Sequence, residues 1–353
     1  MMMDFEQNED GMERAEPQYP ESGRDFSAGQ PPGTRSSKGS AWKVLLGILL
    51  AFSILANIVL FFLLIGVITF FGVGHRTLFA EEILREGPRT NKIAVVNIQG
   101  LIDGGQAQEF VEQLKMAKRD RRVKAVIVRV NSPGGTIAGS DQIYNEIRKF
   151  REEQDKPIVA FMQGIAASGG YYTSVACDRI VAEPTTITGS IGVMFGHFVL
   201  QQLLEEKLGI KPVIITAGQK KGWPSMFQDF TNEQREYVQD KLITPAYERF
   251  VQVVADGRSP LSLPDVRDLA DGGIYGAQEA LEKKLIDRTG YLDDAIEEVK
   301  SLANIKKAQV VEYRRPFSLA RLLSYGSRGR FNIDTSTLYE LSVPQVLYLW
   351  RLN

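Results

Sequence analysis

Apolar residues are distributed unevenly along the chain, and their pattern separates an N-terminal tail from a long apolar segment. Residues 1–40 are polar and rich in Gly, Pro, Ser and Glu, so they cannot bury enough apolar surface to fold alone. The 31 residues of 44–74 contain no Asp, Glu, Lys or Arg. About 20 apolar residues span a bilayer, whereas the apolar core of a cleaved signal peptide has about 7–15. The pattern therefore predicts a disordered tail over 1–42 and a transmembrane anchor over 43–75.

Basic residues near the anchor give only weak information about its orientation. Each flank carries three of them: Arg35, Lys38 and Lys43 before the segment, and Arg76, Arg85 and Arg89 after it. The first group is the tighter cluster. The positive-inside rule therefore favours a cytoplasmic N-terminus.

Strand-like and helix-like patterns alternate after the anchor. Strands are predicted at 92–99, 123–130 and 157–163, with helices at 106–120 and 138–152 between them. The second strand is an almost continuous apolar run, which is typical of a strand covered on both faces. This β-α-β-α-β order predicts an α/β fold with a mostly parallel sheet and right-handed crossovers.

The second half of the chain is predicted to be more helical. Thr231 and Gln234 fit a capping box that opens a long helix toward residue 255, and shorter helices are expected near 277–284 and 292–302. We place the globular domain at 91–303. Residues 304–353 form an extension of unknown role, whose apolar end could pack on the domain or on a neighbour.

Composition narrows the possible functions. The formal net charge of −1 gives no basic surface and argues against a nucleic-acid partner. Cys177 is the one cysteine, so no intramolecular disulfide can form, and we expect it to be a buried packing residue. With only two histidines besides, a zinc site is almost excluded.

Ser168 lies in a run of small residues directly after the third predicted strand and before a helical segment. This position puts a hydroxyl at a helix N-terminus, where free N–H groups favour developing negative charge. The N–H of Gly169 could then be one donor of an oxyanion hole. The alternative is a serine that simply caps the helix.

Two further glycine-rich turns could belong to the same site. Asn131-Ser-Pro-Gly-Gly135 follows a buried strand, and its uncovered N–H groups could supply the other oxyanion donor or could form an ordinary turn. Ser190, between Gly189 and Ile191, could orient a general base or could also be a turn residue.

A serine nucleophile needs a base. His75 borders the apolar segment, and His197 has apolar neighbours of the kind that surround packed histidines. A lysine can serve where burial favours its neutral form. Lys220 and Lys221 precede Gly-Trp-Pro and lie near Phe227, which could exclude water; the alternative is a solvated loop.

Together these motifs are more specific than any one of them. Ser-Pro-Gly-Gly, Ala-Ala-Ser-Gly-Gly-Tyr-Tyr and Thr-Gly-Ser-Ile-Gly-Val occur in this order, and Lys221 follows Ser168 by 53 residues. The combination resembles the signal peptide peptidase A family, in its short single-domain form. The resemblance covers roughly residues 90–303 and the N-terminal anchor.

The resemblance implies a Clp/crotonase-like spiral of ββα-type repeats and a Ser–Lys dyad. Ser168 matches the nucleophile and Lys221 the base, while Ser190 matches the hydroxyl that holds the lysine. Gly135 and Gly169 match the oxyanion donors. No metal or organic cofactor is implied.

The resemblance also implies a membrane enzyme that hydrolyses peptides, in particular remnant signal peptides, and assembles as a homo-oligomeric ring. Its catalytic domain would lie outside the cytoplasmic membrane, with the N-terminus in the cytoplasm.

Two departures and three alternatives remain open. Gly222 stands where the family often has an acidic residue after the base, and Gly273 stands where it often has arginine. Lys220 leaves the choice between neighbouring lysines unsettled. The alternatives are an acyl-CoA enzyme of the crotonase kind, a Ser-His-Asp peptidase of the Clp kind, and a non-catalytic membrane scaffold.

Overall fold

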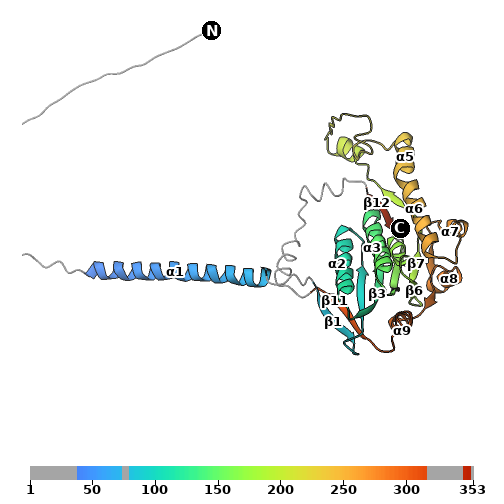
Figure 1. Cartoon of the computed structure of the whole chain (residues 1–353). Coiled ribbons are helices and arrows are strands. Elements are labelled where there is room, and N and C mark those ends of the chain that lie inside the picture. Colours follow the sequence, from blue (N-terminus) through green and yellow to red (C-terminus); the bar gives the residue numbers. More distant parts are fainter. Residues whose placement is uncertain (1–37, 74–78, 316–344, 351–353) are drawn as a thin grey trace, which may run out of the picture. The chain divides into compact units, whose positions relative to one another are not determined.

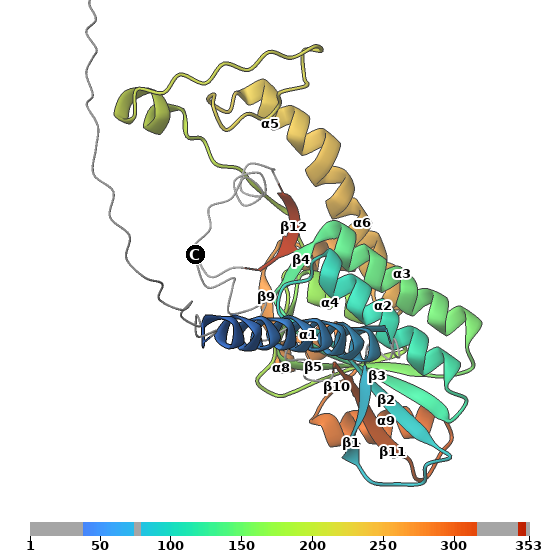
Figure 2. The same ribbon diagram turned by 90° about the vertical axis from the view of Figure 1, so that its left-hand side faces the viewer.

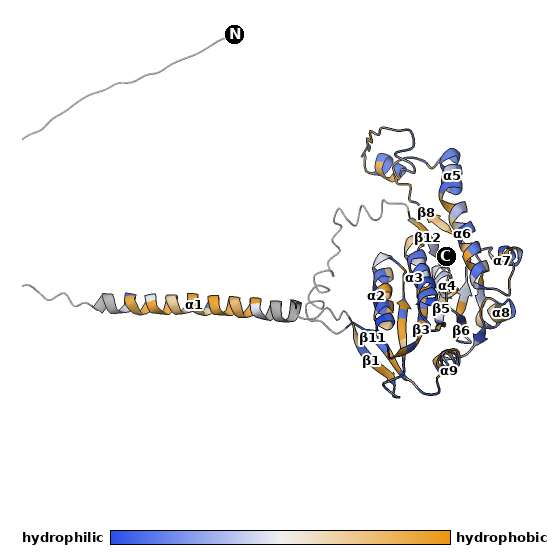
Figure 3. Cartoon of the chain, in the orientation of Figure 1, coloured by the Kyte–Doolittle hydropathy of each residue, from blue (hydrophilic) through white to orange (hydrophobic). Residues whose placement is uncertain are grey.

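The computed structural model describes residues 38–73, 79–315 and 345–350, so most of the predicted tail lies outside the described residues. The chain divides into two units, Met1–Arg76 and Thr77–Asn353, which are treated separately. The first contains one long helix, α1 (Lys38–Val73). Within it, Trp42–Gly66 has a mean hydropathy of 2.9 and is long enough to cross a bilayer. Apolar residues predominate along the coloured part of α1 in Figure 3, as expected of a helix in contact with lipid.

The second unit is built on a nine-stranded sheet (Figure 1). Its main order is β1-β11-β2-β3-β5-β6-β10, with β7 beside β5 and β9 beside β7. The strands are β1 (Ala80–Arg85), β2 (Lys92–Gln99), β3 (Val123–Ser132), β5 (Ile158–Ala167), β6 (Arg179–Ala182), β7 (Ile187–Gly189), β9 (Ile274–Gly276), β10 (Arg288–Thr289) and β11 (Gln309–Arg314). All pairings are parallel except β1 with β11 and β7 with β9. The predicted α/β class with a mostly parallel sheet is confirmed.

Helices cover both faces of this sheet, and each face has its own apolar core. On one face, α2 (Gly104–Arg119), α3 (Ile137–Glu153), α4 (Gly169–Ser174) and α6 (Thr244–Gly257) share a core with the alternate residues Ala94, Val96 and Ile98 of β2. On the other face, α9 (Leu292–Leu302) shares a core with Ile93 and Val95. Burial on both faces explains why β2 and β3 read as continuous apolar runs.

The predicted long helix begins where expected, but it is not uniform. Thr231 accepts from the Gln234 backbone N–H, and the Gln234 side chain accepts from the Thr231 N–H, which completes the capping box. The helix then runs through α5 (Asn232–Val238), a wider π-helical turn (Gln239–Ile243) and α6. The remaining described helices are a π-helical turn at Leu203–Lys207, α7 (Leu263–Leu269) and α8 (Ala277–Glu282).

The C-terminal extension supplies strands to two sheets. Strand β11 lies between β1 and β2 in the main sheet. This sheet therefore includes one strand that precedes residue 91 and one that follows residue 303, both outside the predicted 91–303 domain. A second, three-stranded sheet has the order β4-β12-β8, formed by Gly134–Thr136, Gln345–Leu349 and Met194–Gly196. Both outer strands adjoin motifs that the sequence singled out, so this small sheet lies at the candidate site.

Candidate active site

Ser168 follows the last residue of β5 in a backbone conformation that non-glycine residues rarely adopt. Its φ is +53° and its ψ is −116°, and its hydroxyl caps none of the N–H groups at the start of α4 in the described structure. The capping interpretation is therefore wrong. Strained residues of this kind cost about 1–3 kcal/mol and cluster at functional sites. The side chain is 1% exposed, and the Ser168 backbone N–H donates to the Gly189 carbonyl at 2.8 Å.

Ser190 lies beside Ser168 because of the pairing between β5 and β7. These strands are parallel, and Ala167 is the register partner of Gly189. Since each serine is the next residue after its strand, the two turns leave the sheet at the same level. Ser190 also has a positive φ of +49°, and its N–H donates to the Gly273 carbonyl at 2.6 Å. The structure thus brings two of the predicted site residues together.

The Ser-Pro-Gly-Gly turn lies directly against the Ser168 turn. A Cβ on Gly134, whose φ is +104°, would lie 2.7 Å from the Gly169 nitrogen. The Gly134 N–H donates to the Ser132 hydroxyl at 3.0 Å, so it is not free for a ligand. Gly135 is the next residue with an N–H on this turn. A Cβ there would lie 2.0 Å from the Ile102 carbonyl oxygen, so close packing alone also requires glycine at this position.

No hydrogen bond joins Lys221 to Ser168 within the described residues of the single chain. Lys221 is exposed, on the segment between β8 and α5 that projects away from the sheet in Figures 1 and 2. Within the described residues, the Lys221 amine makes no hydrogen bond or ion pair. The Lys220 amine instead lies over two aromatic rings, 5.3 Å from the centre of Trp223 and 4.6 Å from that of Tyr237. The expected desolvation of Lys221 is absent in this chain by itself.

His197 and Cys177, which were expected to be packing residues, do pack against neighbouring side chains or lie buried. His197 lies against the rings of Phe195 and Phe230, with centroid distances of 6.3 and 5.8 Å. Cys177 is buried, and burial raises the pKa of its thiol, which disfavours the reactive thiolate. His75 lies outside the described residues.

Sequence reasoning missed Ser140. Its hydroxyl is fully buried and is one of two buried side-chain polar groups without a partner in the described chain, the other being His197 Nε2. A Cβ on Gly169 would lie 2.5 Å from the Ser140 oxygen, so this hydroxyl lies directly against the Ser168 turn. Only its place on α3, after the Gly-Gly turn, could have suggested it.

Sequence reasoning also missed an aromatic cluster behind the turn. The ring of Tyr172 lies 5.0 Å from Phe250 and 5.3 Å from Tyr144, and the Tyr172 hydroxyl donates to Asp141 at 2.5 Å. Burial, reinforced by Asp141, raises the pKa of Tyr172. The described residues contain no cluster of three or more potential metal ligands.

A buried, strained serine between two glycine turns on an α/β sheet of this kind is typical of serine peptidases with a Clp-like fold. Family comparisons agree: the model of the Clp protease family matches residues 87–186, and that of peptidase family S49 matches residues 150–306. The chain belongs to peptidase family S49.

Similar proteins support the same class. The chain is 38% identical over 245 residues to a putative signal peptide peptidase SppA of Enterococcus faecium, which covers 66% of this chain and 70% of that protein. It is 36% identical to a putative protease of Methanocaldococcus jannaschii, over 62% of this chain and 71% of that protein. A putative protease of Synechocystis is 35% identical, over 67% and 83% respectively. The acyl-CoA and scaffold alternatives are set aside by this membership.

Gly189 gives a test of this geometry, because its carbonyl holds the Ser168 N–H and it directly precedes Ser190. Its φ is +84°, and a Cβ would lie 2.5 Å from the Tyr275 ring. We expect Gly189→Ala to destabilise the fold by about 1–3 kcal/mol and to reduce peptide hydrolysis. Urea unfolding and peptide cleavage by the full-length protein in detergent would measure both. Gly276→Ala is the matched control, since a Cβ there meets nothing within 4 Å. Equal effects of the two substitutions would contradict the geometry.

Proposed function

We propose that Ser168 and Lys221 form the catalytic dyad of this serine peptidase. Ser168 attacks the peptide carbonyl while Lys221 accepts its proton and then passes it to the leaving amine. The Gly135 and Gly169 N–H groups stabilise the oxyanion, and Ser190 orients the lysine amine. Water then releases the acyl group from Ser168. The observation that carries this proposal is the strained Ser168 turn, paired through β5 and β7 with Ser190 and touching the Gly134-Gly135 turn.

The proposed substrates are peptides, in particular signal peptides left in the membrane after secretion. Support comes from the name of the Enterococcus faecium relative and from the apolar helix α1, which would hold the enzyme close to such substrates. No metal or organic cofactor enters the proposed reaction.

We further propose that the enzyme works as a homo-oligomeric ring and that assembly completes the site. Lys221 is exposed on a projecting segment, whereas Ser168 is buried at the sheet. A second copy of the chain could receive this segment and exclude water from the lysine, which favours the neutral amine that a base requires. Each subunit would then give its lysine to a neighbouring serine. Clp-like folds are often oligomeric, in agreement with this assembly.

The membrane arrangement is also a proposal. Helix α1 would be a single-pass anchor in the cytoplasmic membrane, with the N-terminus in the cytoplasm and the catalytic unit on the other side.

Substitution of the dyad tests the mechanism. Ser168→Ala should abolish both hydrolysis and labelling by a fluorophosphonate probe. Lys221→Ala should lower the turnover number by at least about a hundredfold, because a general base contributes roughly 10²–10⁴. Initial rates on a fluorogenic peptide would give these values.

Three matched variants distinguish the dyad from other mechanisms. Lys220→Ala should have a mild effect, because this lysine rests on Trp223 and Tyr237. The hydrolytic activity of Ser190→Ala should fall between those of Lys220→Ala and Lys221→Ala. His197→Ala should retain substantial activity. Near-normal hydrolysis by Lys221→Ala together with loss in His197→Ala would refute the dyad.

Mixed assemblies test whether the lysine acts across subunits. Ser168→Ala and Lys221→Ala subunits, each inactive alone, should recover activity when they are co-expressed, because some neighbours then combine an intact serine with an intact lysine. Differently tagged subunits and tandem purification would establish that the assemblies are mixed. Absence of recovery in confirmed mixed assemblies would show that Lys221 serves its own subunit after a movement of the projecting segment.

Orientation in the membrane is testable with one introduced thiol. Since Cys177 is buried, a Lys124→Cys variant carries one exposed cysteine in the described catalytic unit. A membrane-impermeant maleimide should label this variant on cells whose cytoplasmic membrane is intact. Labelling that requires disruption of that membrane would reverse the proposed orientation.

A further inference from the structure

Two polar side chains interrupt the apolar surface of α1. Past Lys43, every side chain in the Trp42–Gly66 segment is apolar except those of Ser53 and Asn57. These two residues lie four positions apart and therefore on one face of the helix. Asn57 is three residues past the middle of the segment, or about 4.5 Å along the helix axis, so in a bilayer it would lie deep in the hydrocarbon. A polar side chain at that depth is costly and marks a contact or a function.

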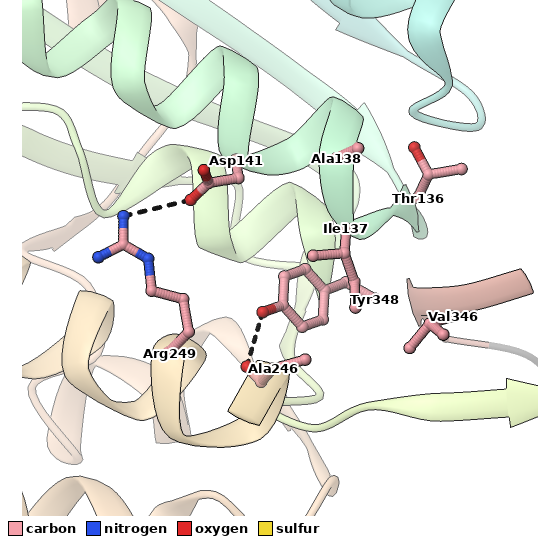
Figure 4. Close-up of a pocket in the computed structure, with 8 residues that line it drawn as sticks. All are labelled: Thr136, Ile137, Ala138, Asp141, Ala246, Arg249, Val346 and Tyr348. Atoms are coloured by element: carbon pink, nitrogen blue, oxygen red, sulfur yellow. Dashed lines mark hydrogen bonds and ion pairs between the residues drawn. The ribbon is translucent and has the colours of Figure 1, made fainter. Parts of the chain in front are cut away.

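The amide of Asn57 has hydrogen-bonding capacity that its own chain does not use. Such an amide has two N–H donors and one accepting oxygen. Within the described residues it makes one bond, from Nδ2 to the Ser53 carbonyl at 2.7 Å, which leaves the other N–H and the oxygen without a partner. In the catalytic unit, by contrast, the Tyr348 hydroxyl and the Arg249 guanidinium both find acceptors in the same chain (Figure 4). Lipid tails offer no such partner.

Ser53 and Asn57 also belong to a stripe that repeats every seven residues. Leucines precede and follow them at alternating spacings of four and three residues, which gives the series Leu46, Leu50, Ser53, Asn57, Leu60 and Leu64. These are the a and d positions of a parallel coiled coil, in which a period of 3.5 residues keeps one seam against the partner. All six side chains are exposed in the described chain. The opposite face, with Ile48, Leu55 and Val59, is entirely apolar.

A second copy of α1 is the partner whose chemistry fits this stripe. All copies of the chain enter the membrane in the same orientation, so two copies of α1 would lie parallel and in register. Asn57 then lies beside Asn57, and the amide oxygen of each can accept from an N–H of the other. Interhelical bonds of this kind join membrane helices, where apolar side chains alone supply little driving force. One polar residue in a leucine seam also fixes the register.

We propose that α1 associates with itself in the membrane through the seam of Leu46, Leu50, Ser53, Asn57, Leu60 and Leu64, with Asn57 as its hydrogen-bonded centre. The inference rests on the proposed place of α1 in the membrane and goes beyond the proposed ring of catalytic units. Anchors joined in this way hold their catalytic units at an effective concentration on the order of millimolar. The ring then assembles from chains that are already paired in the bilayer.

Cysteine cross-linking of the full-length protein in its membrane tests the seam. Cys177 is buried, so an introduced cysteine is the one that reacts. On mild oxidation, Leu50→Cys and Leu60→Cys should give disulfide-linked dimers, whereas Ile48→Cys and Val59→Cys, at similar depths on the opposite face, should give severalfold less. With two co-expressed tags, both tags should occur in the dimer. Equal yields from the two faces would overturn the inference, and so would an adduct with a different protein in place of the dimer.

Substitution of Asn57 tests the hydrogen bond itself. In the Leu60→Cys background, Asn57→Leu should weaken association roughly threefold to thirtyfold, as expected for loss of an interhelical hydrogen bond. Leucine favours membrane insertion, so failed insertion would not explain the loss. Asn57→Gln keeps the amide and should retain most of the dimer, and Leu55→Ala on the opposite face should leave the yield unchanged. An undiminished dimer in Asn57→Leu would show that the amide is not the contact.

Extraction with alkaline carbonate separates this inference from the membrane arrangement on which it rests. Release of the protein by carbonate without detergent would contradict the place of α1 in the bilayer, and the inference with it. A protein that resists carbonate but shows no preference between the two faces of α1 would remove the self-association and leave the anchor intact. We expect resistance to carbonate together with cross-linking from the Asn57 face.

Discussion

The parallel pairing of β5 with β7 is the constraint on which the site depends. It fixes Ala167 opposite Gly189, so that the next residue of each strand, Ser168 and Ser190, leaves the sheet at the same level. The hydrogen bond from the Ser168 N–H to the Gly189 carbonyl then holds Ser168 in a strained backbone conformation. The surrounding packing stabilises this strain, since the same sheet is buried on both faces by separate apolar cores. The geometry of the candidate site is thus a property of strand register more than of any one loop.

Much of the fold and part of the site could be predicted from the sequence. The limits of β2 were predicted to the residue because its apolar run is bounded by polar turns and covered on both faces. Ser168 and Ser190 stood out because the small residues around them permit the tight turns that follow β5 and β7, and their catalytic role stays a prediction. The π-helical turn at Gln239–Ile243 could not be predicted, since an inserted residue leaves the helical pattern of a sequence almost unchanged.

Other features depend on contacts that no local pattern encodes. β12 pairs with two three-residue strands that are distant in the sequence, and its own five residues carry no turn or periodicity signal. The exposure of Lys221 in the single chain was not expected for a related reason: Trp223 and Phe227 suggested an apolar environment, but Trp223 contacts Lys220, and the segment projects from the sheet. Sequence neighbours therefore indicated the kind of residue that could act as the base, and not the surface that would bury it.

The position of β11 has a consequence for how the chain reaches its native state. β1 pairs with the sheet only through β11, with Ala80 opposite Arg314, and β11 also covers the edge of β2. During synthesis the edge of β2 therefore stays open until the ribosome has released nearly the whole catalytic unit. Such long-range pairing slows folding, and an open strand edge invites intermolecular association. Helix α1 emerges first, so a nascent chain that enters the membrane early would be kept apart from chains in solution during this vulnerable interval.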